Sequence, residues 1–297
     1  MSFTAEVKSE LSKLEFPSEY CKRSFAYGFL LYGKSFTSRS VSCATDYAEV
    51  MDAFERTVRE TAGVEVTVNR LKSGKYKLRV PTAEDRKRLI EYFDHSVDSV
   101  SLRINRGVLE DDDCYGAFLR GAFLSCGSIA DPNKGYHMEF VVPYRNLSLD
   151  LMKILTDYGL KAKHIIRKYA HVVYLKDSES IEDLLTLMGA VNSSLELMGI
   201  KIQKDVRNKI NRQMNFESAN MSRSIEAGLA QVEAIEIIEK KQGLDSLSDE
   251  LKEVAILRKE NPDMSLKQLG ENLSVPISRS GVNHRLMKIM EIADKYR

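Results

Sequence analysis

The chain has 297 residues, of which 43% are apolar and 29% are charged, and its formal net charge is only +1. This length suits two domains of about 100–200 residues each, and the near-neutral charge confines any nucleic-acid surface to a local patch. The four cysteines form no Cys-x-x-Cys pair, and no apolar run approaches the roughly 20 residues that a membrane span requires. We therefore expect an intracellular, cytoplasmic protein with free thiols and no membrane partner.

Two apolar segments resemble each other and define an internal repeat. After an expected amphipathic helix over residues 3–15, one apolar helix is expected over 24–32 and another over 115–125. They align at an offset of 93 residues, which pairs Gly28 with Gly121. The elements expected after the first helix are a strand over 39–45, a helix over 48–61, two strands within 64–80 and a helix over 83–93; those after the second are a strand over 135–142, a helix over 147–158, strands over 160–168 and 171–176, and a helix over 180–188.

This order predicts the same α-β-β-α-β-β-α unit twice, in a domain of the α+β class. Two copies of one unit usually pack about a pseudo-twofold axis, with their most apolar elements against each other. We expect the two apolar helices to form that contact. Four glycines fit it, because the absence of a Cβ atom lets two backbones approach closely. They are Gly28, Gly33, Gly121 and Gly127.

A basic run connects the repeats to the rest of the chain. Residues 201–212 contain five Lys or Arg and one acid, and they lead into a helix expected over 218–240. The run is either an ordinary solvated face or a track along a DNA backbone. Gly243 follows the helix, since glycine is favoured just past a helix C-terminus. An apolar stripe on this helix, which we expect to pack on a neighbour, contains Met221, Ile225, Leu229, Val232 and either Ile235 or Ile238.

Residues 265–297 carry the pattern of a helix-turn-helix. Ser265 and Gln268 form a capping box that starts a short helix, and Pro276 interrupts the helical pattern. Ser278 is a good N-cap for a second helix. The residues that this second helix would bury are Val282, Leu286 and either Ile289 or Met290. The residues that it would turn outward are Arg279, Ser280, Asn283, His284, Arg285 and Lys288.

The outward face has the chemistry of DNA recognition. Arginine and asparagine side chains form hydrogen bonds with the edges of guanine and adenine, and from Lys267 to Arg297 there are six Lys or Arg against three acids. The alternative is a small solvated helical hairpin. We predict base or phosphate contacts from Arg279, Ser280, Asn283 and Arg285, and backbone contacts from Lys267, His284 and Lys288. Ser265, Gln268 and Ser278 complete the predicted site.

The paired glycine-containing helices in a duplicated unit resemble the LAGLIDADG homing-endonuclease fold. Together with the terminal segment, nearly the whole chain resembles the WhiA family of bacterial regulators, which are linked to sporulation control or to cell division and chromosome segregation. The most specific matching segments are residues 118–140, 215–224 and 278–289. The resemblance implies a duplicated LAGLIDADG-type domain with pseudo-twofold symmetry, followed by an all-α helix-turn-helix domain.

The resemblance also indicates what the first module lacks. In nucleases of this fold, an acid at the penultimate position of each motif holds the metal ions that activate water. Those positions here carry Gly33, or Tyr32 in a shifted register, and Cys126. Neither apolar helix contains Asp or Glu, and Asp131 lies beyond the second helix without a counterpart in the first repeat. We expect a module that cannot cut DNA, with no catalytic residue, no metal and no cofactor.

The strands of both repeats carry basic residues, and the resemblance implies that they form a saddle that can lie on a duplex. Such cations contact phosphates. Alternatively, they discourage edge-to-edge aggregation, or the sheets have become a protein-binding face. The basic residues are Arg70, Lys72, Lys75, Lys77 and Arg79 in the first copy and Lys161, Lys163, Arg167, Lys168 and Lys176 in the second. The predicted phosphate contacts are Lys75, Lys77, Arg79, Arg167 and Lys168, with Lys204, Arg207, Lys209 and Arg212 from the connector.

We thus predict three parts: a degenerate endonuclease-like domain over 1–200, a basic helical linker over 201–242 and a helix-turn-helix domain over 243–297. The predicted function is a nucleoid-associated transcriptional regulator of sporulation, or of cell division and chromosome segregation. It would bind double-stranded DNA, without nuclease activity and without a small-molecule substrate. The alternatives are a protein-interaction factor that acts on RNA polymerase or another transcription factor, an active homing-type endonuclease, and a catalyst that uses Cys126.

Overall fold

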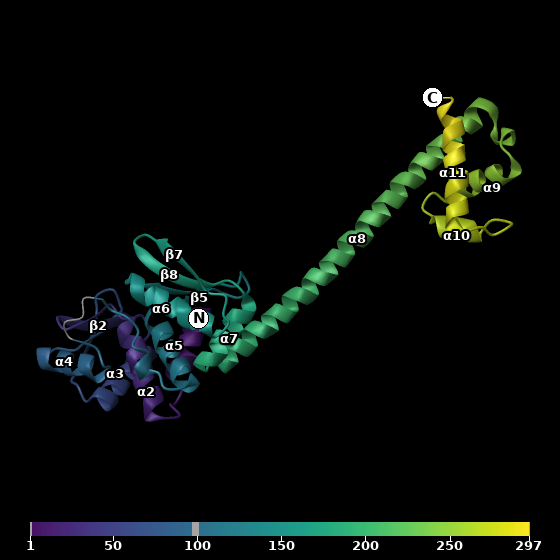
Figure 1. Cartoon of the computed structure of the whole chain (residues 1–297). Coiled ribbons are helices and arrows are strands. Elements are labelled where there is room, and N and C mark those ends of the chain that lie inside the picture. Colours follow the sequence, from purple (N-terminus) through teal and green to yellow (C-terminus); the bar gives the residue numbers. More distant parts are fainter. Residues whose placement is uncertain (1, 97–100, 297) are drawn as a thin grey trace. The chain divides into compact units, whose positions relative to one another are not determined.

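The computed structural model describes residues 2–96 and 101–296, so that Arg297, counted above among the basic residues, lies outside them. The chain divides into two compact units, Met1–Lys204 and Asp205–Arg297 (Figure 1). Among the described helices, none combines the length and the apolar character that a bilayer crossing demands. The three-part division predicted from the sequence stays a prediction.

Unit one contains two repeats with the same order of elements. The first repeat follows α1 (Phe3–Ser12) and comprises α2 (Glu19–Leu31), β1 (Ser35–Thr37), β2 (Ser40–Thr45), α3 (Ala48–Ala62), β3 (Thr67–Arg70), β4 (Tyr76–Arg79) and α4 (Ala83–Tyr92). The second follows η1 (Arg106–Val108) and comprises α5 (Asp112–Cys126), β5 (Gly127–Ile129), β6 (Met138–Val142), α6 (Arg145–Asp157), β7 (Lys163–Arg167), β8 (Ala170–Leu175) and α7 (Ser178–Met188). The predicted α-β-β-α-β-β-α unit is confirmed in both copies.

Each repeat folds its four strands into one antiparallel sheet. The order is β1-β2-β4-β3 in the first repeat and β5-β6-β8-β7 in the second. Because side chains alternate along a strand, β4 turns the fully buried Leu78 toward the core and Lys77 and Arg79 toward the opposite face. No residue range is predicted from the sequence for β1 or β5, the first strand of each repeat. A strand of three residues is too short to show an alternating pattern.

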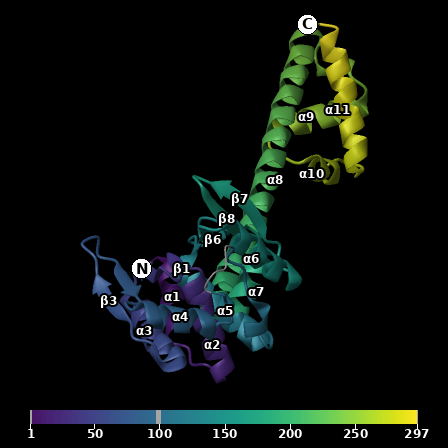
Figure 2. The ribbon, with the colours of Figure 1, turned by 60° about the vertical axis from the view of Figure 1, so that its left-hand side comes forward.

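The two apolar helices α2 and α5 lie side by side in unit one (Figures 1 and 2). A Cβ atom at Gly28 would overlap the carbonyl oxygen of Phe118, and one at Gly121 would overlap the carbonyl oxygen of Phe25. The two contacts are related by the repeat offset, so each helix supplies the same glycine to the other. The predicted close packing of these helices is therefore confirmed for Gly28 and Gly121.

Gly33 and Gly127 take no part in this contact, and the prediction is wrong for them. A Cβ atom at Gly33 would lie 3.0 Å from the carbonyl oxygens of Leu30 and Ser42, and one at Gly127 would overlap the ring of Phe123. These neighbours belong to the same repeat as each glycine. Both glycines therefore serve the turn from a helix into the strand that follows it.

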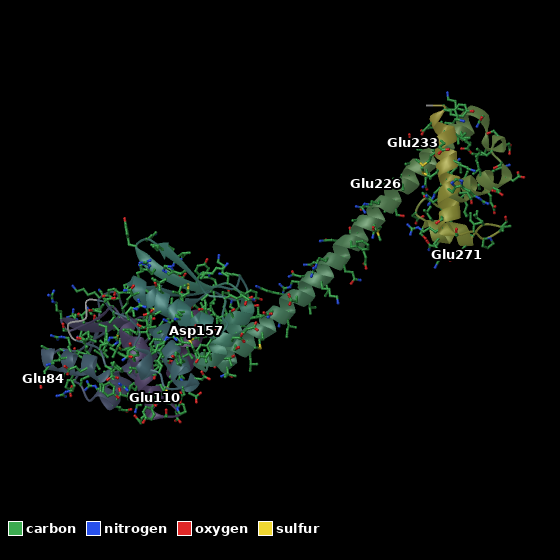
Figure 3. All side chains as sticks on the ribbon, viewed as in Figure 1. Glu84, Glu110, Asp157, Glu226, Glu233 and Glu271 are labelled. Carbon is green, nitrogen blue, oxygen red and sulfur yellow. The ribbon has the colours of Figure 1, made fainter. Side chains whose placement is uncertain are left out.

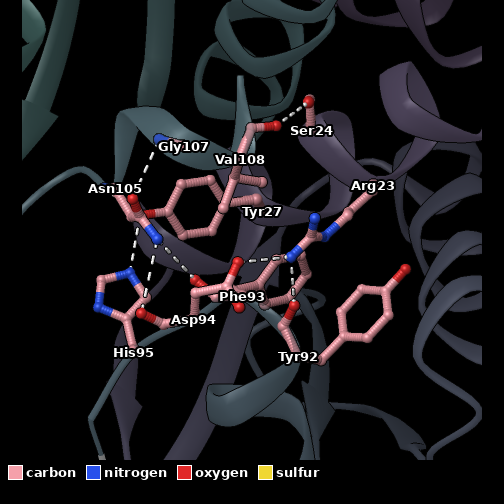
Figure 4. A network of polar contacts seen from close by, with 10 residues as sticks. All are labelled: Arg23, Ser24, Tyr27, Tyr92, Phe93, Asp94, His95, Asn105, Gly107 and Val108. Carbon is pink, nitrogen blue, oxygen red and sulfur yellow. Dashed lines mark hydrogen bonds and ion pairs between the residues drawn. The ribbon is translucent and has the colours of Figure 1, made fainter. Parts of the chain in front are cut away.

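A polar network ties the segment between the repeats to α2 (Figure 4). The backbone N–H of Asn105 donates to the hydroxyl of Tyr27 at 2.7 Å, and the same hydroxyl lies 2.7 Å from Nε2 of His95. Arg23, also on α2, pairs with Asp94 at 2.9 Å. Burial lowers the pKa of His95 below its usual value. The connection between the repeats is thus held in place by side chains of the central helix.

Unit two contains α9 (Asp249–Glu260), α10 (Leu266–Glu271) and α11 (Arg279–Asp294), with η2 (Leu244–Ser246) before them. Unit two begins within α8 (Val191–Gln242), a helix of 52 residues whose first residues belong to unit one. This helix starts well before residue 218, so the predicted start is wrong and the basic run over 201–212 is itself helical. Ile202, Val206 and Ile210 recur every four residues along this run, at helical spacing, but all three are exposed. The basic composition of the run therefore masks its helical period.

The apolar stripe predicted on α8 packs only at its end. Ile235 and Ile238 are fully buried in the core of unit two, with residues of α9, α10 and α11. By contrast, Met221, Ile225 and Leu229 are 67%, 47% and 59% exposed, so no described element of this chain covers them, and their packing on a neighbour stays a prediction. On α11 the buried residues are Val282, Leu286 and Ile289, and Met290 is only partly buried.

Candidate nucleic-acid interface

The helices of the helix-turn-helix begin at side-chain caps, as predicted. The hydroxyl of Ser265 accepts the backbone N–H of Gln268 at 3.3 Å, and the side-chain oxygen of Gln268 accepts the backbone N–H of Ser265 at 3.0 Å. The hydroxyl of Ser278 accepts the backbone N–H of Gly281 at 3.2 Å, at the start of α11. These polar groups of the predicted site are therefore already engaged in starting the two helices.

A close approach between α10 and the turn fixes the start of α11. The backbone N–H of Ile277 donates to the carbonyl of Gly270 at 3.1 Å. A Cβ atom at Gly270 would overlap the carbonyl oxygen of Ile277 and lie 3.1 Å from the side chain of Val282. Because Val282 is fully buried, the face of α11 opposite to it is turned toward solvent.

Five of the six side chains predicted to face outward on α11 are exposed. They are Arg279, Ser280, Asn283, His284 and Lys288. The first four border a hollow of about 540 Å³, together with Leu266 and Met287. No carboxylate is among the described residues that border this hollow. The exposed face thus combines cationic and hydrogen-bonding side chains without an opposing negative charge.

Arg285 is the exception, and the prediction of an outward side chain is wrong for it. Only 20% of this side chain is exposed, and its guanidinium pairs with Glu250 of α9 at 3.1 Å. Arg285 lies three residues after Val282 and four residues before Ile289, both of which are fully buried. Residues at these spacings share one face of a helix, so Arg285 points toward α9.

Lys267 stands on α10, next to the exposed face of α11. Its ammonium group lies 3.8 Å from the carboxylate of Glu271, one turn later; Glu271 is labelled in Figure 3. The two side chains are 78% and 60% exposed. A surface pair of this kind contributes little to stability, so Lys267 remains available to a phosphate.

Five polar residues beside the predicted site are not predicted from the sequence. Asn220, Arg223, Ser224 and Gln231 of α8 and Arg258 of α9 border a second hollow of about 680 Å³, together with Arg279 and Asn283. The family-specific segment over 215–224 contains three of them. Their place next to α11 depends on how α8 packs against the other helices, which a periodic pattern in one helix cannot show.

The basic residues of the strands fall into two groups. Lys77 and Arg79 lie two residues apart on β4 and so point to the same face of the sheet. Burial and the positive charge of Arg79 lower the pKa of Lys77. Lys75 and Arg167 instead pair with acids of their own repeat, Asp46 at 3.1 Å and Glu139 at 2.8 Å. Lys168 is exposed next to the last residue of β7.

The basic residues of the connector also divide into one that has partners within the chain and three that are exposed. The ammonium group of Lys204 donates to the carbonyl of Pro132 at 2.6 Å and lies 4.9 Å from the centre of the Tyr136 ring. The remaining predicted contacts, Arg207, Lys209 and Arg212, are exposed on α8. Lys204 thus has partners within unit one, whereas the other three face solvent.

A lysine occupies the end of α5, next to the position of the missing acid. Lys8 of α1 is 6% exposed, and its ammonium group donates to the carbonyl of Leu124 at 3.0 Å. The rings of Tyr47 and Phe123 lie 5.5 and 5.7 Å from it. Burial lowers the pKa of Lys8 from 10.5 to about 8. A cation at this place repels the divalent metal ion that a nuclease would hold there.

Two other residues named in the sequence analysis as candidates for chemistry are Cys126 and Asp131. Burial raises the pKa of the Cys126 thiol to about 12, so the thiol stays protonated and unreactive at neutral pH. Asp131 accepts the backbone N–H of Asn133 at 2.9 Å within a turn, which holds its pKa below the usual range.

One group of three residues has the spacing of metal ligands, among the residues that the structure describes: Cys21, Asp111 and Cys114. The two sulfur atoms lie 3.6 Å apart, at the same offset of 93 residues that relates the repeats. Burial raises the pKa of Cys114 to about 11, and Asp111 caps α5 by accepting the backbone N–H of Cys114 at 2.8 Å. Asp111 is thus already engaged in capping α5, which leaves only two thiols, so we assign no ion to this group.

Comparison with known proteins matches both halves of this arrangement. Residues 115–207 match the WhiA LAGLIDADG-like domain and residues 210–293 the WhiA C-terminal HTH domain. Two proteins named probable cell division protein WhiA, from Lachnospira eligens and Staphylococcus haemolyticus, are 39% and 35% identical to the chain; each match covers 100% of this chain and 98% of the relative.

Solved structures share the fold. The crystal structure of full-length DUF199/WhiA from Thermatoga maritima has a TM-score of 0.63 and 24% identity and covers 100% of this chain and 99% of that one. The crystal structure of the N-terminal LAGLIDADG domain of DUF199/WhiA has a TM-score of 0.51 and 22% identity over 63% of this chain and 92% of that one.

The fold and the terminal helices define a helix-turn-helix protein on a LAGLIDADG-like scaffold. The predicted α+β architecture is thereby confirmed. With 39% identity over 98% of a WhiA relative, the chain belongs to the WhiA family.

Proposed function

We propose that this chain is a DNA-binding transcriptional regulator that acts in cell division and chromosome segregation or in sporulation. The names of its relatives support a role in cell division. The observation that carries the DNA-binding part is the exposed face of α11, where Arg279, Asn283 and His284 border a hollow without a carboxylate among its described residues. The proposed partner is double-stranded DNA, and the proposed location is the nucleoid in the cytoplasm.

Each exposed residue has a role that suits its chemistry. Arg279, Ser280 and Asn283 contact base edges or phosphates at the start of α11, since the first turns of such a helix reach deepest into a major groove. Lys267, His284 and Lys288 contact the backbone. Arg285 joins the interface only if it exchanges Glu250 for DNA.

The scaffold in this proposal does not cut DNA. The positions of the metal-binding acids carry Gly33 and Cys126, and Lys8 places a positive charge beside the second of them. The first sheet supplies a weak second contact through Lys77 and Arg79. Two weak contacts on one chain reinforce each other through effective concentration.

A second candidate function rests on apolar residues in the same unit. Val275 in the turn is 72% exposed and Met287 on α11 is 50% exposed. Such side chains suit a protein partner better than a phosphate backbone. In this alternative the helix-turn-helix docks on RNA polymerase or another transcription factor, and its own affinity for DNA is weak.

The affinity of the full chain for duplex DNA across a series of salt concentrations distinguishes the two functions. Phosphate binding predicts a steep linear fall of the logarithm of affinity with the logarithm of salt concentration. Arg279→Ala should weaken binding and make this slope shallower by about 1. A weak affinity that hardly changes with salt, or an unchanged slope for Arg279→Ala, would favour the protein-docking function instead.

A further inference from the structure

The hollow bordered by α8, α9, α10 and α11 is the larger of the two described beside the helix-turn-helix, at about 680 Å³. Four cations border it: Arg223, Arg258, Lys267 and Arg279. No carboxylate is among the described residues that line it, although Glu271 pairs with Lys267 at the surface. A concave site with charge of one sign concentrates ligands of the opposite sign, so its ligand is an anion.

Arg258 gives this hollow a buried donor in need of a partner. The residue is 3% exposed, and its Nη1 atom donates to the carbonyl oxygens of Met264 at 2.6 Å and Pro262 at 3.2 Å. Its Nε atom is buried and has no hydrogen-bond partner among the described residues. A buried donor that is left without a partner destabilises the fold, because it has lost its hydrogen bonds to water. A bound anion would accept a hydrogen bond from this Nε atom and so remove the destabilisation.

Gln231 adds a second group of the same kind. It is 7% exposed, and its side-chain oxygen is buried without a hydrogen-bond partner among the described residues. A half-turn about its last bond exchanges the amide oxygen for the NH2 group, and the two are assigned only from their surroundings. Gln231 can therefore donate to an anion in the hollow.

The packing of α8 shows that this hollow is built into unit two. A Cβ atom at Gly228 would lie 2.5 Å from the carbonyl oxygen of Pro262, so the backbone of α8 rests directly on the segment that leads to α10. Asn220 and Ser224 precede Gly228 by eight and four residues, and Arg223 precedes Gln231 by eight. These spacings place all of them on one side of the helix, and Asn220, Arg223, Ser224 and Gln231 all border the hollow.

We propose that this hollow is a phosphate-binding site, in which Arg223 of α8 and Arg258 of α9 hold one phosphate group. The expected source is the backbone of duplex DNA, because Arg279 and Asn283 border this hollow and the one on the exposed face of α11 alike. That choice of source rests on the proposed DNA-binding function. A free phosphate-bearing ligand is the other source of the same chemistry. In either case α8 is part of the binding site and not only a connector.

Two measurements on the full chain test the site, each with wild type, Arg223→Gln and Lys241→Gln. Arg223 is exposed on α8, so its substitution keeps the fold, and Lys241 is an exposed residue of the same helix that does not border the hollow. The first measurement is the salt dependence of affinity for a random-sequence duplex. The second is the shift of the unfolding temperature by inorganic phosphate, against chloride at equal ionic strength.

We expect Arg223→Gln to weaken DNA binding several-fold and to make the salt slope shallower by about 1, while Lys241→Gln matches wild type. If DNA binding is equal in all three proteins but phosphate stabilises every protein except Arg223→Gln, the ligand is a free phosphate-bearing molecule. If wild type binds no DNA and still shows that phosphate response, the site stands and the proposed function fails. Equal behaviour of Arg223→Gln and Lys241→Gln in both measurements overturns the site.

Discussion

Lys8 places an ammonium group in a buried position at the end of α5, where desolvation opposes its charge. Its pKa falls from 10.5 to about 8. The unfolded chain therefore holds this proton between about pH 8 and 10.5, whereas the folded chain releases it. Stability from this group rises with pH through that window, because the unfolded state binds more protons there.

Replacing Lys8 with methionine should remove this pH dependence. Relative to Lys8→Met, the wild type should gain about 3 kcal/mol of unfolding free energy between about pH 8 and 10.5, the value that corresponds to the pKa difference. Urea unfolding of both proteins across this range measures the change. Lys13→Met, an exposed substitution just after the same helix, is the control and should keep the wild-type profile. A constant difference between Lys8→Met and wild type would show that Lys8 is not held in a desolvated state.

Gly28 tests the contact between the two repeats. A Cβ atom there would overlap the carbonyl oxygen of Phe118, which belongs to the backbone and cannot move aside. We expect Gly28→Ala to destabilise the fold by about 3 kcal/mol, at the upper end of the overpacking range. Gly135→Ala is the matched control, because a Cβ atom at Gly135 meets nothing within 4 Å. Thermal unfolding of both variants decides, and equal stability would mean that α2 and α5 do not pack as described.

The sequence predicts this contact because the repeat itself points to it. Two apolar helices at a fixed offset must bury their most apolar faces, and a glycine shared at equivalent positions marks the closest approach. The same reasoning fails for Gly33 and Gly127, which the offset of 93 residues does not pair with each other, since it aligns Gly33 with Cys126. Their neighbours come from within one repeat, and an offset between repeats carries no information about such local turns.

At the scale of single elements, α11 and α9 are linked by the ion pair of Arg285 and Glu250. In the proposed function, Glu250 both holds Arg285 away from DNA and repels phosphates. Glu250→Gln should therefore tighten binding to duplex DNA several-fold at moderate salt, since charges at the rim of an interface chiefly change attraction and salt dependence. Anisotropy titrations of the full chain measure this. Glu260→Gln is the control, because Glu260 is an exposed acid at the end of α9. An equal gain in affinity in both variants would show that the effect comes from net charge and not from the release of Arg285.

The exposed faces of α10 and α11 are predicted from local signals, whereas α8 is not. Capping boxes, a proline in the turn and a row of buried aliphatic residues lie within a few residues of one another, so they can be recognised in the sequence. The length of α8 and its contribution to the second hollow depend on contacts between elements far apart in the chain. Arg285 shows the same limit, because the partner that turns it inward lies on α9.

At the scale of the whole molecule, the chain contains a duplicated scaffold without the metal-binding acids and a second unit with two adjoining hollows that cationic side chains border. The architecture follows from the duplication and the family resemblance, and the structure confirms it. The site is predicted only in part, because side chains from α8 and α9 complete a surface of which the sequence reveals only the residues of α10 and α11.

Selection of bound sequences from a random pool of duplex DNA tests the central claim most directly. The full wild-type chain should enrich one sequence motif, because side chains of α11 contact base edges. Asn283→Ala should lose preference at one position of that motif, at a cost of about 1–3 kcal/mol, while keeping the salt-dependent affinity for other DNA. Absence of any enriched motif, or the same motif from Asn283→Ala as from wild type, would contradict recognition by this helix.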